Sequence, residues 1–394
     1  MQSDGSTRTQ VSPFVPGTGA SPPVLAGRES HKSRLEELCL RLAETRIGAH
    51  RPAVLIGPRG NGKTVLLNWL EERATGMNID ALWLTPDQIP SVDALAERVG
   101  GSPSGSLEAV RVSGRVGELG GAADVKLRKP RGHAPPDLTG IFRRRTTRRP
   151  FALLLDEAHT LDAEVGRALL KAAQTASRSA PLLLAMAGTP DLLDVLGEMS
   201  ATFWGWAMKV SVGLLSEEEV VMAIADPLKW SGIGLEDDKA WALVTGDSQG
   251  YPYFVQTWGE ELWRQGGMVR DTDSAGGEDG RIALSEREVK AAGARVSVVK
   301  NDFYGDRYEE LGKLGLLGPA RAVAEAFASS LPPAAFSWEA LTEIAQRGID
   351  PNLPRVDVLR ELSHVGFVWR SPDSENWRPG IPSLMNYVLE RGAD

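Results

Sequence analysis

One octapeptide constrains this chain more than any other feature: residues 57–64 read GPRGNGKT and satisfy the pattern G-x-x-x-x-G-K-[ST] at every fixed position. The apolar run at residues 53–56 predicts a buried parallel strand before it, and residues 65–72 predict a helix after it. Strand, glycine-rich turn and helix together form the setting in which this pattern binds phosphate. We therefore predict a P-loop within an α/β core, in which a parallel sheet carries helices on both faces.

The predicted P-loop supplies most of the predicted nucleotide contacts. Its glycines let the backbone curl so that N–H groups point at phosphate oxygens, and the helix start adds a favourable partial charge. We expect the Lys63 ammonium to reach the β- and γ-phosphates and the Thr64 hydroxyl to ligate Mg²⁺. The predicted cofactors are therefore ATP and Mg²⁺, held by Gly57, Pro58, Arg59, Gly60, Asn61, Gly62, Lys63 and Thr64.

A second apolar run, at residues 151–155, ends in two carboxylates, which is the form of a Walker B segment. We predict that Asp156 holds the magnesium ion and that Glu157 orients and polarises the attacking water. The alternative is that the two acids only cap a helix after the strand. Residues 156–159 also spell the helicase box DEAH, but we recognise no second motor domain in the sequence, so we interpret His159 as local structure.

A third apolar run, at residues 181–187, is followed by the turn G-T-P with Thr189 at its centre. Ligands of parallel α/β sheets bind at the carboxyl ends of the strands, where this turn would meet the P-loop. We therefore predict that Thr189 contacts the γ-phosphate or the attacking water, so that Glu157, Lys63 and Thr189 form the catalytic set. A turn residue before proline is the alternative interpretation of Thr189.

The sequence divides into four predicted regions. Residues 1–23, rich in Ser, Thr, Gly and Pro, predict a disordered leader, and residues 24–212 alternate strands and helices as the nucleotide-binding core. Residues 213–300 are helical and predict a lid with a linker. Residues 301–394 contain helices followed by a two-stranded ribbon, an order that predicts a winged helix. Within the core, residues 100–121 are loop-like and are interpreted as an insertion or a pair of short strands.

Composition excludes several classes of protein. The net charge of −8 gives no general attraction to nucleic acid, so any such contact must be local. No apolar run approaches the roughly 20 residues that cross a membrane, and the start of the chain lacks a charged segment followed by an apolar one. We therefore predict a cytoplasmic protein without a membrane partner, in which the single cysteine, Cys39, is a core residue.

The most basic region is residues 126–149, which contain nine Lys or Arg and one acid. Two interpretations stay open: a solvated helix face with its loop, or a nonspecific contact with DNA phosphates. Residues 303–394 carry nine Lys or Arg against thirteen Asp or Glu, a net charge of −4, whereas winged helices that bind duplex DNA need a positive surface. The charge therefore favours an unknown protein partner for the C-terminal domain.

These motifs, in this order, resemble the AAA+ ATPases of the Orc1/Cdc6-like and STAND type with a C-terminal winged helix. The resemblance implies an ATP-driven switch in which a helical lid clamps the nucleotide, and a homo-oligomer that forms on ATP binding. It also implies that Arg28, Tyr251 and Pro252 flank the adenine. The segments that carry the resemblance are residues 26–29 (AGRE), the P-loop, and residues 155–159 (LDEAH), 187–190 (AGTP) and 250–254 (GYPYF).

Two departures from that family bear on turnover. Residues 202–209, where an arginine finger is expected, contain Trp206 and Lys209 but no arginine, and residues 250–254 lack a lid arginine. An arginine finger is worth about 10³ to 10⁵ in rate. We therefore predict a slowly hydrolysing switch as the leading function, with an ATP-dependent DNA-binding initiator or transposition-type regulator as the alternative.

Overall fold

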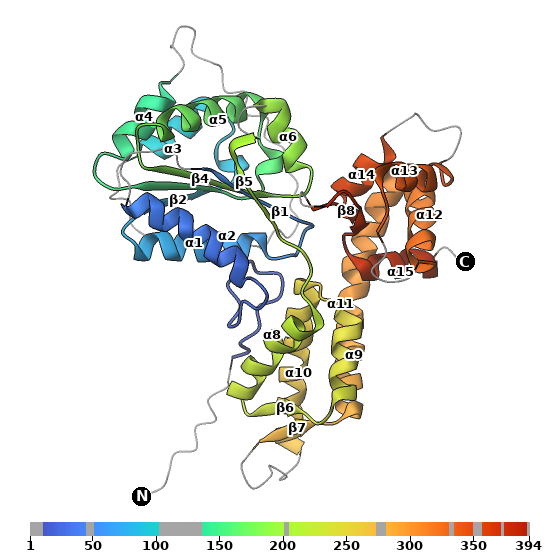
Figure 1. Cartoon of the computed structure of the whole chain (residues 1–394). Helices are drawn as coiled ribbons and strands as arrows, with labels where there is room; N and C mark the ends of the chain where they lie inside the picture. Colours follow the sequence, from blue (N-terminus) through green and yellow to red (C-terminus); the bar gives the residue numbers. More distant parts are fainter. Residues whose placement is uncertain are drawn as a thin grey trace, which may run out of the picture.

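Three parts follow one another along the chain in the computed structural model (Figure 1): an α/β core, a helical lid and a C-terminal helical domain. No helix of the described residues has the length and apolar character needed to cross a membrane. Residues 102–135, which hold most of the predicted insertion and the start of the basic region, lie outside the described residues. The structure describes residues 11–44, 51–101, 136–200, 205–272, 281–330, 335–349, 357–371 and 374–391.

The core is built on a parallel sheet of five strands in the spatial order β2-β3-β4-β1-β5. The P-loop strand β1 lies between β4 and β5, and β4 separates it from the Walker B strand β3. This arrangement confirms the predicted fold class of the core. The strands are β1 (Ala53–Ile56), β2 (Asp80–Leu84), β3 (Phe151–Leu155), β4 (Leu182–Gly188) and β5 (Met208–Ser211).

The side chains of the strands alternate between two hydrophobic layers. On β1, Val54 and Ile56 pack into one layer, whereas Ala53 and Leu55 pack into the other. Because helices cover both faces, every residue of β1, β3 and β4 is buried, which explains the continuous apolar runs. The predicted core residue Cys39 also lies in the second layer. The first face carries α3 (Val92–Gly100), α4 (Leu138–Arg145), α5 (Ala163–Ser177) and α6 (Leu192–Met199), and the second carries α1 (Glu29–Glu44) and α2 (Lys63–Gly76) (Figure 1).

The lid is a group of long helices with a two-stranded parallel ribbon at the end away from the core (Figure 1). Its first helix begins at a capping box, in which the Ser216 hydroxyl accepts from the Glu219 N–H and the Glu219 carboxylate accepts from the Ser216 N–H. The elements of the lid are α8 (Glu217–Trp230), β6 (Ile233–Leu235), α9 (Asp238–Ser248), α10 (Pro252–Thr272), β7 (Ile282–Leu284) and α11 (Glu286–Lys313).

The last helix of the lid continues into the C-terminal domain (Figure 1). The predicted boundary at residue 300 falls inside the uninterrupted helix α11, so the two parts share that helix. The described part of the C-terminal domain then contains helices and a short antiparallel ribbon, the order from which a winged helix was predicted. Its elements are α12 (Leu317–Ala328), α13 (Trp338–Gln346), α14 (Val358–His364), β8 (Val368–Trp369), β9 (Arg378–Pro379) and α15 (Pro382–Arg391).

The prediction of a disordered leader over residues 1–23 is wrong for its second half. Phe14 is buried among side chains of the lid, at a place where Gly259 leaves room for its ring. The Asn68 side chain on α2 donates to the carbonyl of Gly19 (2.7 Å), so the same segment also contacts the core. One aromatic anchor and a few hydrogen bonds therefore order a stretch whose composition alone indicates disorder. Residues 1–10 lie outside the described residues.

Candidate nucleotide-binding site

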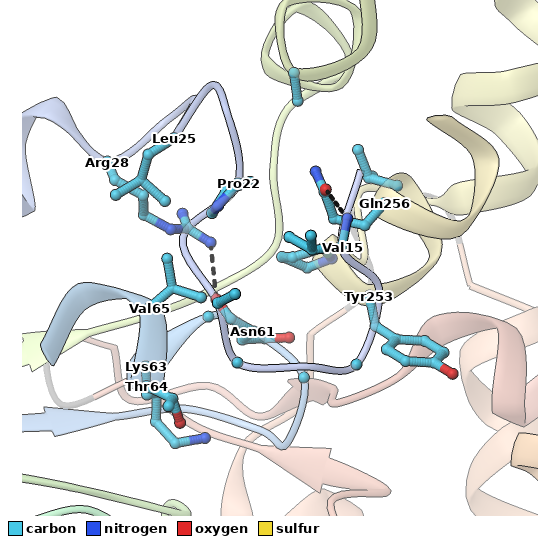
Figure 2. Close-up of a pocket in the computed structure, with 18 of the residues that line it drawn as sticks. Val15, Pro22, Leu25, Arg28, Asn61, Lys63, Thr64, Val65, Tyr253 and Gln256 are labelled. Carbon is cyan, nitrogen blue, oxygen red and sulfur yellow. Dashed lines mark hydrogen bonds between the residues drawn. The ribbon is translucent and has the colours of Figure 1, made fainter. Parts of the chain in front are cut away.

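A pocket of about 670 Å³ lies where the P-loop, the N-terminal segment (residues 11–28) and the lid meet. Figure 2 shows Lys63 of the P-loop on one side of it and Leu25 of the N-terminal segment on another. Helix α10 closes the third side with Tyr253 and Gln256, and the Gln256 side chain accepts from the backbone N–H of Val15 (3.4 Å). Three parts of the chain that are far apart in sequence thus share one pocket.

The P-loop has the curled conformation that its glycines permit. Gly60 and Gly62 have φ of +76° and +89°, in the region that favours glycine. A Cβ at Gly60 would also lie 2.2 Å from the hydroxyl of Tyr251, so this close approach requires glycine for a second reason. Helix α2 begins immediately afterwards, at Lys63. The N–H groups of its first turn have no partner within the helix and are therefore available to phosphate oxygens.

The Lys63 ammonium points back onto the loop. Its Nζ donates to the carbonyls of Gly57 and Pro58, each at 2.9 Å. These two residues lie behind the pocket, whereas the predicted contacts from residues 59–64 line it. Burial lowers the pKa of Lys63 to about 8, although the carboxylates of Glu157 and Asp156 oppose the fall. The two carboxylates thus offset only part of the cost of burying the Lys63 charge in the nucleotide-free protein. Phosphates would supply further negative charge.

The two predicted magnesium ligands lie together. The Thr64 hydroxyl donates to Oδ2 of Asp156 at 2.8 Å, although the two residues are 92 positions apart. Burial raises the pKa of Asp156, while hydrogen bonds from Thr64 and from the N–H of Glu157 oppose the rise. A hydroxyl and one carboxylate fit Mg²⁺, which takes few protein oxygens and completes its shell with phosphates and water.

Glu157 reaches the pocket through an uncommon backbone conformation. Its φ of +50° and ψ of +32° are left-handed, a conformation that costs a non-glycine residue about 1–3 kcal/mol. The side chain is 48% exposed and lines the pocket, so a water molecule can reach its carboxylate. His159 lies beside it, with Nδ1 3.5 Å from Oε2 of Glu157, and burial lowers the pKa of that imidazole.

Thr189 is not on the wall of the pocket. It is buried just after β4, and its hydroxyl donates to the carboxylate of Asp191. Asp191 is nevertheless close enough to Lys63 and His159 for its charge to oppose the fall in both of their pKa values. Sequence reasoning missed Asp191, because an acid at a helix start resembles any other N-cap.

Arg28 lies on the pocket wall, where the resemblance placed it. The side chain is buried, and its Nη2 donates to the carbonyl of Asn61 (3.2 Å; Figure 2). The same Nη2 donates to the carbonyl of Gly213 (2.6 Å). Burial lowers the pKa of Arg28, and the charge of Glu219 opposes this effect. The guanidinium therefore ties the P-loop to the segment that follows β5.

Tyr251, which the resemblance places beside the adenine, does not line the pocket. Its side chain is fully buried in the C-terminal hydrophobic cluster, and its hydroxyl donates to the carbonyl of Arg59 at 2.7 Å. Tyr251 thus supports the P-loop from behind, and its neighbours Pro252 and Tyr253 line the pocket instead. The pattern GYPYF does not predict in which direction the Tyr251 side chain points at the start of α10.

Among the described residues, Arg28 and Arg59 are the arginines that line the pocket. Trp206, at the expected position of an arginine finger, packs against the first hydrophobic layer of the core. Lys209 lies on the edge strand β5. Neither lines the pocket, and residues 201–204 lie outside the described residues.

No protein-family model matches the sequence, and no curated protein matches it. The ORC2 protein of Aeropyrum pernix in its ADPNP–ADP complexes is similar in structure, with 15% identity and a TM-score of 0.54 over 95% of this chain and 96% of that chain. Its ADP form has 16% identity and a TM-score of 0.52, over 94% and 96%. At such identities the similarity shows the fold alone. The chain therefore shares its fold, a parallel α/β core followed by helical domains, with this protein over almost its whole length.

Proposed function

We propose that this protein binds ATP with Mg²⁺ and hydrolyses it slowly, as an AAA+-type molecular switch. One observation carries the proposal: Lys63, Thr64 and Glu157 line a single pocket, and the Thr64 hydroxyl donates to the buried Asp156 beside it. The fold is shared with a protein whose structures contain ADPNP and ADP, which supports an adenine nucleotide as the ligand. The candidate residues are Lys63, Thr64, Asp156 and Glu157.

Binding follows from the charges at the start of α2. The phosphates would lie against the N–H groups of its first turn and accept the Lys63 ammonium, which now bonds two loop carbonyls. Their charge would stabilise the protonated state that burial disfavours. When bound, Mg²⁺ neutralises charge between the β- and γ-phosphates. The Thr64 hydroxyl and the Asp156 carboxylate are the groups that would hold it.

Hydrolysis needs a base that can reach both water and the γ-phosphate. Glu157 meets this need, because it is exposed to the pocket while its neighbour Asp156 is buried beside Thr64. Its carboxylate would accept a hydrogen bond from the water and orient it for attack. Thr189 is the further catalytic candidate, and for this role its hydroxyl would have to leave Asp191.

Slow turnover follows from the charges near the transferring group. Of the two arginines that line the pocket among the described residues, Arg28 donates to two carbonyls of the fold, and Arg59 is an exposed residue of the P-loop itself. Trp206 cannot supply a positive charge, and Lys209 would act only as a point charge without the planar fork of arginine. A homo-oligomer that forms on ATP binding is the arrangement that could bring an arginine from a neighbouring subunit.

The shape of the pocket supports a switch. A nucleotide would contact the core, the lid and the N-terminal segment at once, so its loss or hydrolysis would change contacts between all three. Since α11 belongs to both the lid and the C-terminal domain, a movement of the lid would also move that domain. We propose that the C-terminal domain, with the element order of a winged helix, contacts a protein partner.

Turnover of Glu157→Gln tests the proposed function. The variant keeps the shape of the side chain and loses the charge that polarises water, so it should bind Mg²⁺-ATP like the parent but hydrolyse it at least about 100-fold more slowly. Glu164→Gln, at an exposed acid on α5, is the matched control and should hydrolyse ATP at the parent rate. Parent-like turnover in Glu157→Gln would contradict the assignment of the base.

Contact with DNA is a second candidate, favoured by the exposed basic residues around the end of α4. Arg143, Arg144 and Arg148 are exposed, whereas Arg145 is committed to the fold through an ion pair with Asp80 at 2.9 Å. The test is DNA affinity against salt for the parent and for Arg143→Gln/Arg144→Gln, with Arg145 left intact. Loss of two phosphate contacts should reduce the salt slope by about two. An unchanged slope would exclude this surface.

A further inference from the structure

The C-terminal domain rests against the core at a docking seam, which we define as residues 191–198 and 211–213 of the core with residues 360–371 of the domain. The hydroxyl of Ser371 donates to that of Ser211 at 2.8 Å. The indole of Trp369 lies so close to Gly213 that a Cβ there would be 3.5 Å from it. Beside these contacts is a cleft of about 740 Å³, lined by residues of the core and of the C-terminal domain.

Asp191 lies between this seam and the nucleotide site. Its Oδ1 accepts the hydroxyl proton of Thr189, the residue predicted to contact the γ-phosphate. Its Oδ2 lies 3.6 Å from Nε2 of His364, at the end of α14 in the C-terminal domain. One carboxylate thus contacts the core with one oxygen and the C-terminal domain with the other.

The position of Asp191 in its own helix makes this arrangement informative. Asp191 is the N-cap of α6, where an aspartate normally accepts a hydrogen bond from an N–H of the first turn. Here the side chain makes no capping hydrogen bond. It is 8% exposed, so its charge is largely removed from water and depends on the two groups that it contacts. The carboxylate therefore contacts His364 of the seam and accepts from Thr189, and it does not cap α6.

We propose that Asp191 couples the γ-phosphate to the docking of the C-terminal domain, so that ATP loosens the docking seam and ADP does not. The proposal rests on the proposed function, since it requires a nucleotide in the P-loop pocket. Thr189 has one hydroxyl proton, which is donated to Asp191 in this structure; to donate to a γ-phosphate in the pocket, the hydroxyl would have to turn away from Asp191. When the hydroxyl donates to the phosphate instead, Asp191 loses its donor inside the protein and gains a negative neighbour. The turn that carries Asp191 then shifts, and His364 loses its contact.

Two polar contacts of the seam are weak enough to be controlled in this way. The ion pair between Arg360 and Glu198 spans 3.7 Å, with side chains 45% and 73% exposed, so water screens it. The contact between the hydroxyls of Ser371 and Ser211 is a single neutral hydrogen bond. A change at one partly buried carboxylate can therefore shift the balance between docked and undocked states.

The two serines of the seam supply the assay. In Ser211→Cys/Ser371→Cys the two sulfurs would replace oxygens 2.8 Å apart, so a disulfide should form under mild oxidation while the domain is docked. We expect the full chain to cross-link at similar rates without nucleotide and with ADP. With ADPNP the rate should fall at least about fivefold, the lower end of usual coupling between two sites. The native Cys39 is buried and does not compete.

Substitutions at the coupling residues identify the route. In the same cysteine background, Thr189→Val should remove the response to ADPNP, and Thr189→Ser, which keeps the hydroxyl, should retain it. His364→Gln, on the partly exposed side of the contact, should slow cross-linking in every nucleotide state. Asp191→Asn should behave like His364→Gln. A response that survives both Thr189→Val and Asp191→Asn would overturn the proposal.

Binding of a fluorescent ATP analogue to the same proteins distinguishes failure of the proposed function from failure of the coupling. If the analogue does not bind, the proposed function fails, and the coupling fails with it. If the analogue binds but cross-linking proceeds equally fast with ADP and ADPNP, or faster with ADPNP, the nucleotide site stands and the coupling through Asp191 is refuted.

Discussion

Replacing Lys63 by methionine should make the nucleotide-free protein more stable while it abolishes nucleotide binding. The fall in the pKa of Lys63 from 10.5 to about 8 corresponds to about 3 kcal/mol against the charged form at pH 7. Methionine has a similar length and carries no charge, so the substitution removes this cost. It also removes two hydrogen bonds to loop carbonyls, each with a net worth of about 1 kcal/mol. The net gain in the free energy of unfolding is about 1–2 kcal/mol.

The pH dependence has a defined sign. Between about pH 8 and 10.5 the unfolded chain still holds the Lys63 proton, whereas the folded protein has released it. The free energy of unfolding of the parent should therefore rise with pH across this window, and Lys63→Met should lack that contribution. Urea denaturation of both proteins at pH 7 and pH 10, without nucleotide, measures it.

Nucleotide should reverse the order of stability. At 100 times its dissociation constant, ATP stabilises a protein that binds it by about 2.7 kcal/mol. The parent should gain this stability with Mg²⁺-ATP and overtake Lys63→Met, which should gain none. A variant that is less stable than the parent without nucleotide by more than about 1 kcal/mol would refute the reasoning, because Lys63 would then contribute to the fold. Unchanged ATP affinity would refute the site.

Lys300 is the matched control for a buried lysine with a structural role. Its Nζ donates to the Asp247 carboxylate at 2.6 Å and to the carbonyl of the same residue at 2.6 Å. Lys300→Met breaks these contacts away from the pocket, so it should lower the free energy of unfolding and leave ATP affinity unchanged. The opposite pattern in the two lysine variants distinguishes a ligand-binding lysine from a structural one.

Four further outcomes follow from the site. Asp156→Asn should weaken ATP binding in the presence of Mg²⁺ and leave the weaker, metal-free binding unchanged in the same titration. Tyr251→Phe should cost about 1 kcal/mol in urea denaturation, because it removes the hydrogen bond to the P-loop. Arg145→Ala should destabilise the protein by about 2–3 kcal/mol, whereas Arg144→Ala, at an exposed site, should change stability by less than about 0.5 kcal/mol. Turnover per subunit should stay low as the protein concentration rises, and a steep rise would show that a neighbouring subunit supplies an arginine.

The strands that position the site could be predicted because helices bury them on both faces. Burial on both faces requires a continuous apolar run, and β1, β3 and β4 each show one. In a parallel sheet the residues that follow these strands share one edge. The closeness of Thr64 and Asp156 could therefore be predicted from their places after β1 and β3, without knowledge of any side-chain contact.

The features that sequence reasoning missed depend on contacts between distant segments. Phe14 orders the N-terminal segment through a site opposite Gly259, and nothing in the composition of residues 11–23 marks that partner. Tyr251 faces the P-loop rather than the pocket, because the packing of the C-terminal domain sets its direction. Asp191 has the sequence of an ordinary N-cap, and only the tertiary structure places His364 beside it.

The central claim is that one pocket binds Mg²⁺ and ATP through the P-loop and the acids after β3. Calorimetric titration of the full chain with ADPNP, with and without Mg²⁺, tests it most directly, because the analogue reports binding without turnover. We expect one site per chain, tighter with Mg²⁺, that is absent in Lys63→Met and retained in Lys300→Met. No measurable binding to the parent, or equal binding to the parent and Lys63→Met, would contradict the account.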